Sequence, residues 1–119
     1  MEQIRYVTLR NGAAYVARIQ IQYKNIISHD GESKCEGQWR TWETHDYHDI
    51  MLSHERTVDL ADVDEIQDGA KIRLQVFVVA GRDLTANDIF EYRDAAAKTA
   101  AYTCKGTTLF NSLHLDKLH

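Results

Sequence analysis

The sequence predicts an all-β protein folded as an antiparallel β-sandwich of about six to eight strands. Two long segments alternate strictly between apolar and polar residues, which is the period of a strand with one buried face. Turn-forming residues recur at short intervals, and no long amphipathic helix is present. The chain has 119 residues, no proline and 44% hydrophobic residues. This length and composition suit a single domain over residues 1–119.

The N-terminal quarter predicts two strands. The first covers residues 4–10, and Asn11-Gly12 predicts a type I′ hairpin turn into the second. From Tyr15 to Lys24, every second residue is apolar, so we expect one face to be buried. That face consists of Tyr15, Ala17, Ile19, Ile21 and Tyr23. Residues 25–47 lack a clean period and are expected to form a long loop, with a strand over residues 37–44 as the alternative.

The second half predicts the remaining strands. Its strongest pattern buries Ile72, Leu74, Val76 and Val78, with Phe77 and Val79 on the other face. The acidic segment 59–69 is expected to form a turn or one helical turn. Less regular patterns predict further strands over residues 48–60, 100–105 and 107–115. Residues 83–92 predict a short strand or a helical turn, and residues 94–98 a loop or single turn.

Charge and targeting patterns exclude several classes of partner. The formal net charge is −4, and no short window contains more than two basic residues. A clustered basic face for nucleic acid is therefore not expected, nor is a polybasic segment for anionic lipid. The longest apolar run, residues 76–80, is far too short to span a bilayer. The N-terminus has no signal-peptide pattern, so we expect a cytoplasmic protein, or one released by another route.

The best candidate binding segment is aromatic. Trp39, Trp42 and Tyr47, with Arg40 and Glu43 between them, combine flat apolar faces with hydrogen-bonding groups. Such sets bind sugar rings or choline headgroups by stacking and cation–π contacts. In a strand the two tryptophans would lie on opposite faces, so one could instead pack into the core.

Other polar clusters fit known sites less well. Metal-competent side chains occur together at His45, Asp46, His48, Asp49 and His54, but no recognised metal-binding spacing is present. The acidic residues between Asp59 and Asp68 do not match a calcium loop, which favours a solvated turn. Cys35 and Cys104 could form one disulfide, although the alternation around Cys104 favours a buried free thiol. No catalytic motif is present, and we expect neither an enzyme nor a cofactor.

Several short pieces resemble a known family. These are Asn11-Gly12 followed by residues 15–18, then residues 58–62, 68–74 and 106–109. Together they resemble small bacterial and fungal β-sandwich proteins related to the thermostable or delta-type haemolysins, whose architecture looks like that of the actinoporins. The resemblance implies a β-sandwich with a toxin-like role. The basic amphipathic N-terminal helix of actinoporins is absent, so the resemblance transfers no pore residues.

These observations favour a non-enzymatic β-sandwich, lectin-like or toxin-like, that binds a carbohydrate or lipid headgroup through its loops as a homo-oligomer. One alternative is a self-assembling protein whose exposed Phe77, Val79 and Phe110 make subunit contacts. A second alternative is a metal-dependent activity through His45, His48 and His54.

Overall fold

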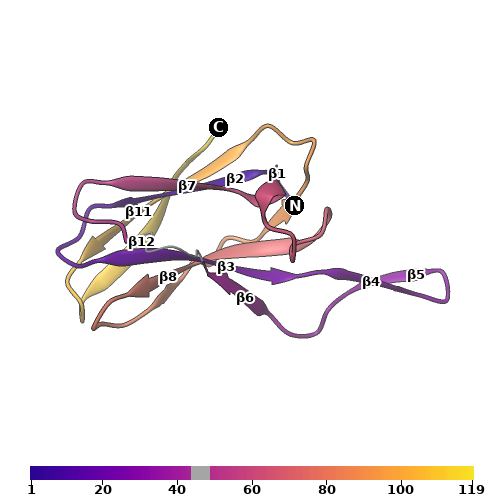
Figure 1. Ribbon diagram of the computed structural model, residues 1–119, viewed down its shortest axis with the longest axis horizontal. Helices are drawn as coiled ribbons and strands as arrows, with labels where there is room; N and C mark the ends of the chain where they lie inside the picture. Colours follow the sequence, from indigo (N-terminus) through magenta and orange to yellow (C-terminus); the bar gives the residue numbers. More distant parts are fainter. Residues whose placement is uncertain (44–48) are drawn as a thin grey trace.

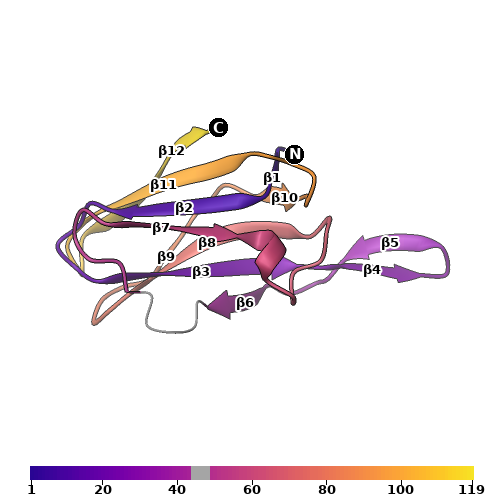
Figure 2. The same ribbon diagram turned by 45° about the horizontal axis from the view of Figure 1, so that its top comes forward.

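Two β-sheets pack face to face, and a narrow hairpin arm extends from one end (Figures 1 and 2). The computed structural model describes residues 1–43 and 49–119, and only the backbone of His29. The molecule measures 49 × 26 × 26 Å, and the arm accounts for its length. No helix in the described part of the chain is long and apolar enough to cross a membrane.

The larger sheet has six strands and is built around the two segments with the clearest alternation. Its strands, in spatial order, are β1 (Gln3–Ile4), β10 (Phe90–Tyr92), β8 (Lys71–Val78), β3 (Ala17–Lys24) and β6 (Arg40–Glu43), with β9 (Leu84–Thr85) also paired to β8. Strands β3 and β8 are antiparallel along their whole length. The predicted alternation is confirmed, because every second residue of each strand is buried.

The smaller sheet has four strands and shows that the fold is not purely antiparallel. Its order is β12 (Asn111–Leu118), β11 (Thr99–Gly106), β2 (Tyr6–Asn11) and β7 (Glu55–Asp59). Strands β2 and β11 are parallel, as are β1 and β10. The all-β sandwich is confirmed, but the antiparallel topology was only partly right. Twelve short strands within the described ranges also replace the six to eight expected.

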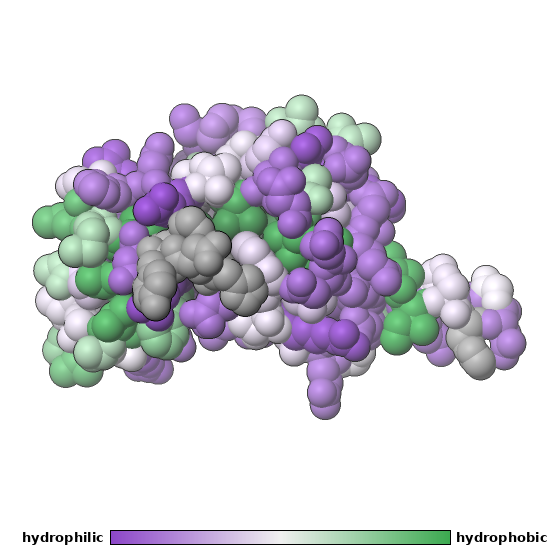
Figure 3. All heavy atoms as spheres, viewed as in Figure 1, coloured by the Kyte–Doolittle hydropathy of each residue, from purple (hydrophilic) through white to green (hydrophobic). Residues whose placement is uncertain are grey.

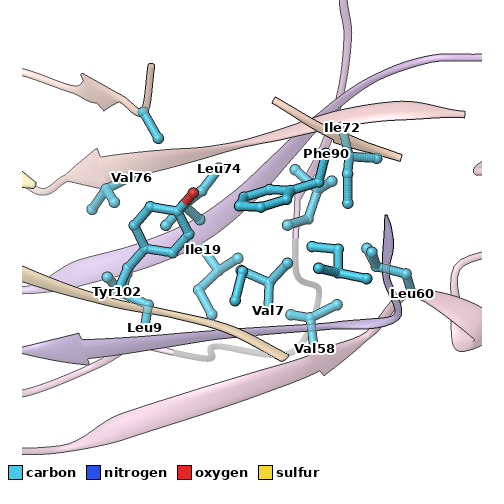
Figure 4. Close-up of a cluster of buried hydrophobic side chains, with 14 of the residues drawn as sticks. Val7, Leu9, Ile19, Val58, Leu60, Ile72, Leu74, Val76, Phe90 and Tyr102 are labelled. Carbon is cyan, nitrogen blue, oxygen red and sulfur yellow. The ribbon is translucent and has the colours of Figure 1, made fainter. Parts of the chain in front are cut away.

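The hydrophobic core fills the space between the two sheets (Figure 4). Leu9 and Tyr102 face Leu74 and Val76 from opposite layers, and all four side chains are buried. At the other end of the cluster Leu60 closes the core from the 3₁₀ helix η1 (Leu60–Asp62), which confirms the predicted turn. Asp59 caps this helix by accepting a hydrogen bond from the Ala61 amide.

The predicted hairpin at Asn11-Gly12 is wrong. Strand β2 ends there in the smaller sheet and β3 begins in the larger one, so residues 12–16 cross between layers instead of joining paired strands. Neither residue has the positive φ of a type I′ turn. Gly12 instead allows a close approach, since a Cβ atom there would lie 3.2 Å from the Cys104 carbonyl oxygen, closer than most such contacts.

The long loop predicted for residues 25–47 is also largely wrong. Strands β4 (Ile26–His29) and β5 (Glu32–Cys35) form the projecting arm, and β6 lies within the alternative strand over residues 37–44. The arm turns at Asp30-Gly31, where φ is 51° and 79°. Two successive positive φ values between paired strands match a type I′ hairpin, so the dipeptide was a usable signal.

The remaining strand boundaries shifted by a few residues. Residues 4–10 split into β1 and β2, because the chain breaks its pairing at Arg5. Only residues 55–59 of the predicted 48–60 strand are confirmed as β7, and residues 83–92 contain β9 and β10. The last strand starts at Asn111 instead of Thr107, since residues 107–110 form the connecting loop.

The two cysteines are free, and they differ in accessibility. Cys104 is fully buried, as predicted, and burial raises the pKa of its thiol. Cys35 is half-buried in the arm. A thiol reagent such as Ellman's reagent should therefore label Cys35 in the native protein and Cys104 only after denaturation. In the Cys35→Ser variant native labelling should disappear. Equal native reactivity of both thiols would contradict this prediction.

Candidate functional site

Four loops gather at the end of the sandwich opposite the arm, which we call the loop end (Figure 1). It consists of residues 12–16, 49–54, 79–83 and 107–110. The topology brings them together because β2 and β11 finish at this end, while β3, β7 and β12 begin there. Four segments that are distant in sequence therefore form one surface.

Asn11 ties two of these loops to the body of the protein. Its side-chain Nδ2 donates hydrogen bonds to the carbonyl oxygens of Tyr15 and Ile50, at 2.6 and 2.8 Å. Its Oδ1 accepts from the Ala13 amide at 2.9 Å. The residue is completely buried, so these bonds are shielded from water. Asn11 therefore fixes both the 12–16 loop and the 49–54 loop.

The other two loops are packed against each other. The Arg82 amide donates to the Thr108 carbonyl oxygen at 3.0 Å, and the Asn111 side chain donates to the Arg82 carbonyl oxygen at 2.8 Å. Gly81 approaches so closely that a Cβ atom would lie 2.7 Å from the Thr108 carbonyl oxygen. The 79–83 and 107–110 loops thus behave as one packed unit.

Large apolar side chains project from the loop end into solvent. The exposed fractions are 52% for Met51, 58% for Leu52, 70% for Leu109 and 84% for Phe110. Figure 3 shows apolar surface at this end of the molecule. Met51 and Leu52 precede β7 and Leu109 and Phe110 precede β12, so two exposed apolar pairs lie at the two edges of the smaller sheet at this end, and both favour an apolar partner.

Exposed basic side chains also occur at the loop end. Arg10, Arg56, Arg82 and Lys105 are all exposed at the loop end, and none forms an ion pair with a carboxylate in the described part of the chain. They come from four separate segments, so no sequence window could reveal the cluster. The prediction that the chain has no polybasic segment concerns neighbours in sequence, and these four residues are brought to one end only by the fold.

A second polar surface lies on the outer face of the larger sheet. Trp39 precedes β6, and its ring lies against two cations: the Arg73 Cζ is 4.2 Å and the Lys24 Nζ 4.9 Å from the ring centroid. Both cations occupy outward positions of β8 and β3. Cation–π contacts of this kind hold an aromatic ring over a strand surface.

The predicted aromatic segment is divided between two faces, as its strand alternative implied. Trp42 pairs with Ile21 and packs against the core, whereas Trp39 lies outside. Arg40 is exposed and forms an ion pair with Glu36 at 2.9 Å. Glu43 is exposed and pairs in register with Gln20. Tyr47 lies outside the described residues, so its proposed role stays a prediction.

The histidine cluster is only partly described. His45, Asp46 and His48 lie outside the described residues, and His54 is exposed at the loop end. Within residues 1–43 and 49–119, no group of three potential ligands could hold a metal ion. Asp49 instead forms an ion pair with Arg18. A metal site through His45, His48 and His54 therefore remains a prediction.

The acidic turn serves the fold in two places. Asp59 accepts two hydrogen bonds from the Arg5 guanidinium, at 2.9 and 3.0 Å, which lowers the pKa of its carboxyl group. Asp68 accepts a hydrogen bond from the Asp94 amide at 2.7 Å. The sequence favoured a solvated turn, but at these two positions the carboxylates bind neighbouring groups of the fold.

Comparison with known proteins gives a likeness of fold. No protein-family model matches the sequence, and no curated protein is significantly similar to it. Pneumolysin has a TM-score of 0.51 and 15% identity, over 97% of this chain and 23% of pneumolysin. A pneumolysin structure described as a sugar-binding protein has a TM-score of 0.50 and 16% identity, over 97% of this chain and 23% of its own. A Gram-negative toxin has a TM-score of 0.50 and 16% identity, over 94% of this chain and 22% of its own.

The chain therefore spans less than a quarter of the proteins it resembles. Identities of 15–16% show a shared fold and nothing finer. The neighbours are toxins, but the likeness is one of fold, so the toxin-like role and the actinoporin and delta-type haemolysin features stay predictions. The chain has the fold of a β-rich portion of pneumolysin and of a Gram-negative toxin.

Proposed function

We propose that this chain is a non-enzymatic recognition domain that attaches to a lipid surface through its loop end. The observation that carries the proposal is the exposure of Met51, Leu52, Leu109 and Phe110 on one end of a rigid sandwich. An end that presents both apolar and basic side chains suits the boundary between anionic headgroups and acyl chains. The likeness to toxins supports the same reading.

Charge strengthens this assignment to a membrane over an ordinary protein partner. The whole chain has a net charge of −4, yet at the loop end the four exposed cations Arg10, Arg56, Arg82 and Lys105 outnumber the exposed carboxylates Glu55 and Asp83. Each basic group near an anionic membrane contributes about 1 kcal/mol of attraction. The acidic remainder of the molecule would orient the domain with the loop end toward the membrane.

The matching experiment measures cosedimentation with vesicles of phosphatidylcholine that contain phosphatidylserine. We expect binding by the native chain and at least a tenfold loss for the double variant Leu109→Ser, Phe110→Ser, because burying each such side chain contributes about 1.5–3 kcal/mol. Ile27→Ser is the matched control, since Ile27 is a similarly exposed apolar residue on the arm. It should bind as the native chain does.

Two results would contradict the proposal. One is equal vesicle binding by the double variant and the Ile27→Ser control. The other is a self-association, seen by light scattering, that the double variant abolishes while vesicles have no effect. That outcome would favour the self-assembly alternative, in which Phe110 makes subunit contacts. Phe77 is less suited to that role, because it is half-buried beneath the Arg18 guanidinium, 5.5 Å from its ring.

We also propose that the protein acts as a homo-oligomer, because several weak surface contacts on one assembly bind far more tightly than one. Light scattering on the same preparations measures the mass.

Carbohydrate recognition, the other ligand class predicted from the sequence, is favoured by different residues on the outer face of the larger sheet. The description of pneumolysin as a sugar-binding protein is consistent with such a role for this fold.

A further inference from the structure

We propose that the outer face of the larger sheet carries a second binding site, for a sugar that bears an anionic substituent such as a sulfate or carboxylate. The site consists of Trp39 with Lys24, Lys71 and Arg73, and we call it the Trp39 site. It deepens the carbohydrate alternative and does not depend on lipid binding at the loop end.

The register of β3 and β8 concentrates positive charge at this position. Lys24 and Lys71 are direct cross-strand partners, and both occupy outward positions. Arg73 follows one outward position along β8. Like charges directly opposite each other destabilise a sheet, so a pair of lysines beside an arginine is unfavourable without an anion. The arrangement is what an anion-binding surface requires.

Lys24, Lys71 and Arg73 form no ion pair with a carboxylate in the described part of the chain. The Arg73 Nε donates instead to the neutral Gln22 Oε1 at 2.6 Å. Glu91 lies in register with Lys71, but its two oxygens accept hydrogen bonds from Arg93 and Gln3, at 3.1 and 2.9 Å. The positive charge of the Trp39 site is therefore available to a ligand.

Trp39 supplies the apolar half of the site. Its ring is positioned by Arg73 and Lys24, which arise from the sheet, and the residue is half-buried, so part of its surface remains open to solvent. The part of the ring that Arg73 and Lys24 leave uncovered would be the stacking surface for the apolar face of a sugar. Ammonium groups beside the ring would then meet a sulfate or carboxylate on the same sugar.

Neutral hydrogen-bonding groups continue the surface along the same face. Gln20 is paired with Gln75, and Gln22 is paired with Arg73 on one side and Thr41 on the other. Amide side chains offer both donors and acceptors, which sugar hydroxyl groups also need. The combination of ring, cations and amides favours an anionic sugar over a simple inorganic ion, which would have no use for the ring.

The test uses four probes that separate these chemistries: 6-sulfated, 3′-sialylated and unmodified N-acetyllactosamine, and inorganic sulfate. The Trp42→Phe variant leaves Trp39 as the only tryptophan, so its fluorescence reports on the site directly. We expect at least one anionic sugar to quench it saturably. That sugar should bind at least tenfold more tightly than the unmodified sugar and inorganic sulfate, with an affinity that falls as salt rises.

Substitutions then locate the binding. Trp39→Ala and Lys71→Gln should each lower the affinity for the anionic sugar about tenfold, which corresponds to about 1.4 kcal/mol. NMR titration measures the first variant and tryptophan fluorescence the second. Lys71→Gln disturbs no aromatic contact, so it stays informative if Trp39→Ala fails to fold. Lys117→Gln, an exposed lysine on β12 of the other sheet, is the matched control and should have no effect.

Three results would overturn the proposal. The first is no saturable binding of either anionic sugar, and the second is equal binding of the unmodified sugar or of inorganic sulfate. The third is an equal loss for Lys117→Gln and Lys71→Gln, which would mean general charge attraction. None of these probes contains lipid, so failure here leaves the vesicle experiment unaffected, and a failure with vesicles leaves this site unaffected.

Discussion

Replacing Asn11 with alanine should destabilise the protein by about 3 kcal/mol, one of the largest effects expected for a single polar residue. The substitution removes three hydrogen bonds to backbone groups, and a weaker one from the Cys104 thiol, from a completely buried side chain. It removes the donor to the Tyr15 carbonyl oxygen and the acceptor of the Ala13 amide, while the Ile50 carbonyl oxygen keeps the Ala17 amide at 3.2 Å, and each buried group left without a partner costs about 1–3 kcal/mol. Urea unfolding followed by circular dichroism would measure the change.

Two further variants sharpen this test. Asn11→Asp has nearly the same shape but places a carboxylate against two carbonyl oxygens, so it should be less stable than Asn11→Ala at neutral pH. Asn87→Ala, at an exposed position, should change the free energy of unfolding by less than about 0.5 kcal/mol. An Asn11→Asp variant more stable than Asn11→Ala would mean that the side-chain amide does not hold the loops.

The fate of Asn11-Gly12 shows what sequence patterns can and cannot predict here. Two dipeptides of the same turn-forming type occur in the chain, and only Asp30-Gly31 forms the hairpin turn. Asn11 instead uses its side chain inside the protein, where tertiary hydrogen bonds outweigh the local turn preference. A turn-forming dipeptide therefore indicates where a hairpin turn could form, but tertiary contacts of its side chains determine whether it does.

Strands β3 and β8 were predicted well because both lie in the centre of a sheet with one face in the core, where alternation is strict. Strand pairing was not predictable in the same way. The parallel contact of β2 with β11 joins residues about 90 positions apart, and neither strand contains a feature that specifies its neighbour. Which strands become neighbours in a sheet is therefore determined by the packing of the whole chain and not by the sequence of either strand.

The candidate sites follow the same division. Trp39 was identified from the sequence because an aromatic residue between polar neighbours is conspicuous. Its partners Lys24 and Arg73 were visible only as polar positions of two strands, since their meeting depends on the register of β3 and β8. At the loop end, Leu109 and Phe110 were included in the strand predicted over residues 107–115, although both lie in a loop and are exposed. An alternating apolar pattern therefore does not by itself distinguish buried apolar residues from exposed ones.

Rigidity at the loop end explains how these exposed side chains stay presented. The 107–110 loop starts from Gly106 and is closed by hydrogen bonds between Thr107 and Phe110, from the Thr107 amide to the Phe110 carbonyl oxygen at 2.9 Å and from the Phe110 amide to Thr107 Oγ1 at 3.1 Å. The Ala14 amide also donates to the Gly106 carbonyl oxygen at 3.2 Å. The position of Phe110 thus depends directly on the backbone of Gly106.

Gly106→Ala should consequently be at least as damaging as Asn11→Ala, with a loss of about 3 kcal/mol or more. Gly106 has φ of 103°, which only glycine adopts readily, and a Cβ atom would lie 2.1 Å from the Phe110 carbonyl oxygen. The loop can relieve that contact only by moving Phe110. We therefore expect loss of vesicle binding as well as lower resistance to urea.

The matched control is Gly37→Ala, because a Cβ atom at Gly37 would have no neighbour within 4 Å and its backbone is not left-handed. The same chemical change there should be neutral or slightly stabilising, since alanine restricts the unfolded chain. Equal effects of the two variants would exclude a special role for the Gly106 turn. A Gly106→Ala protein that unfolds early yet binds vesicles as tightly as the native chain would separate stability from function, and would show that lipid attachment does not require Phe110 in this position.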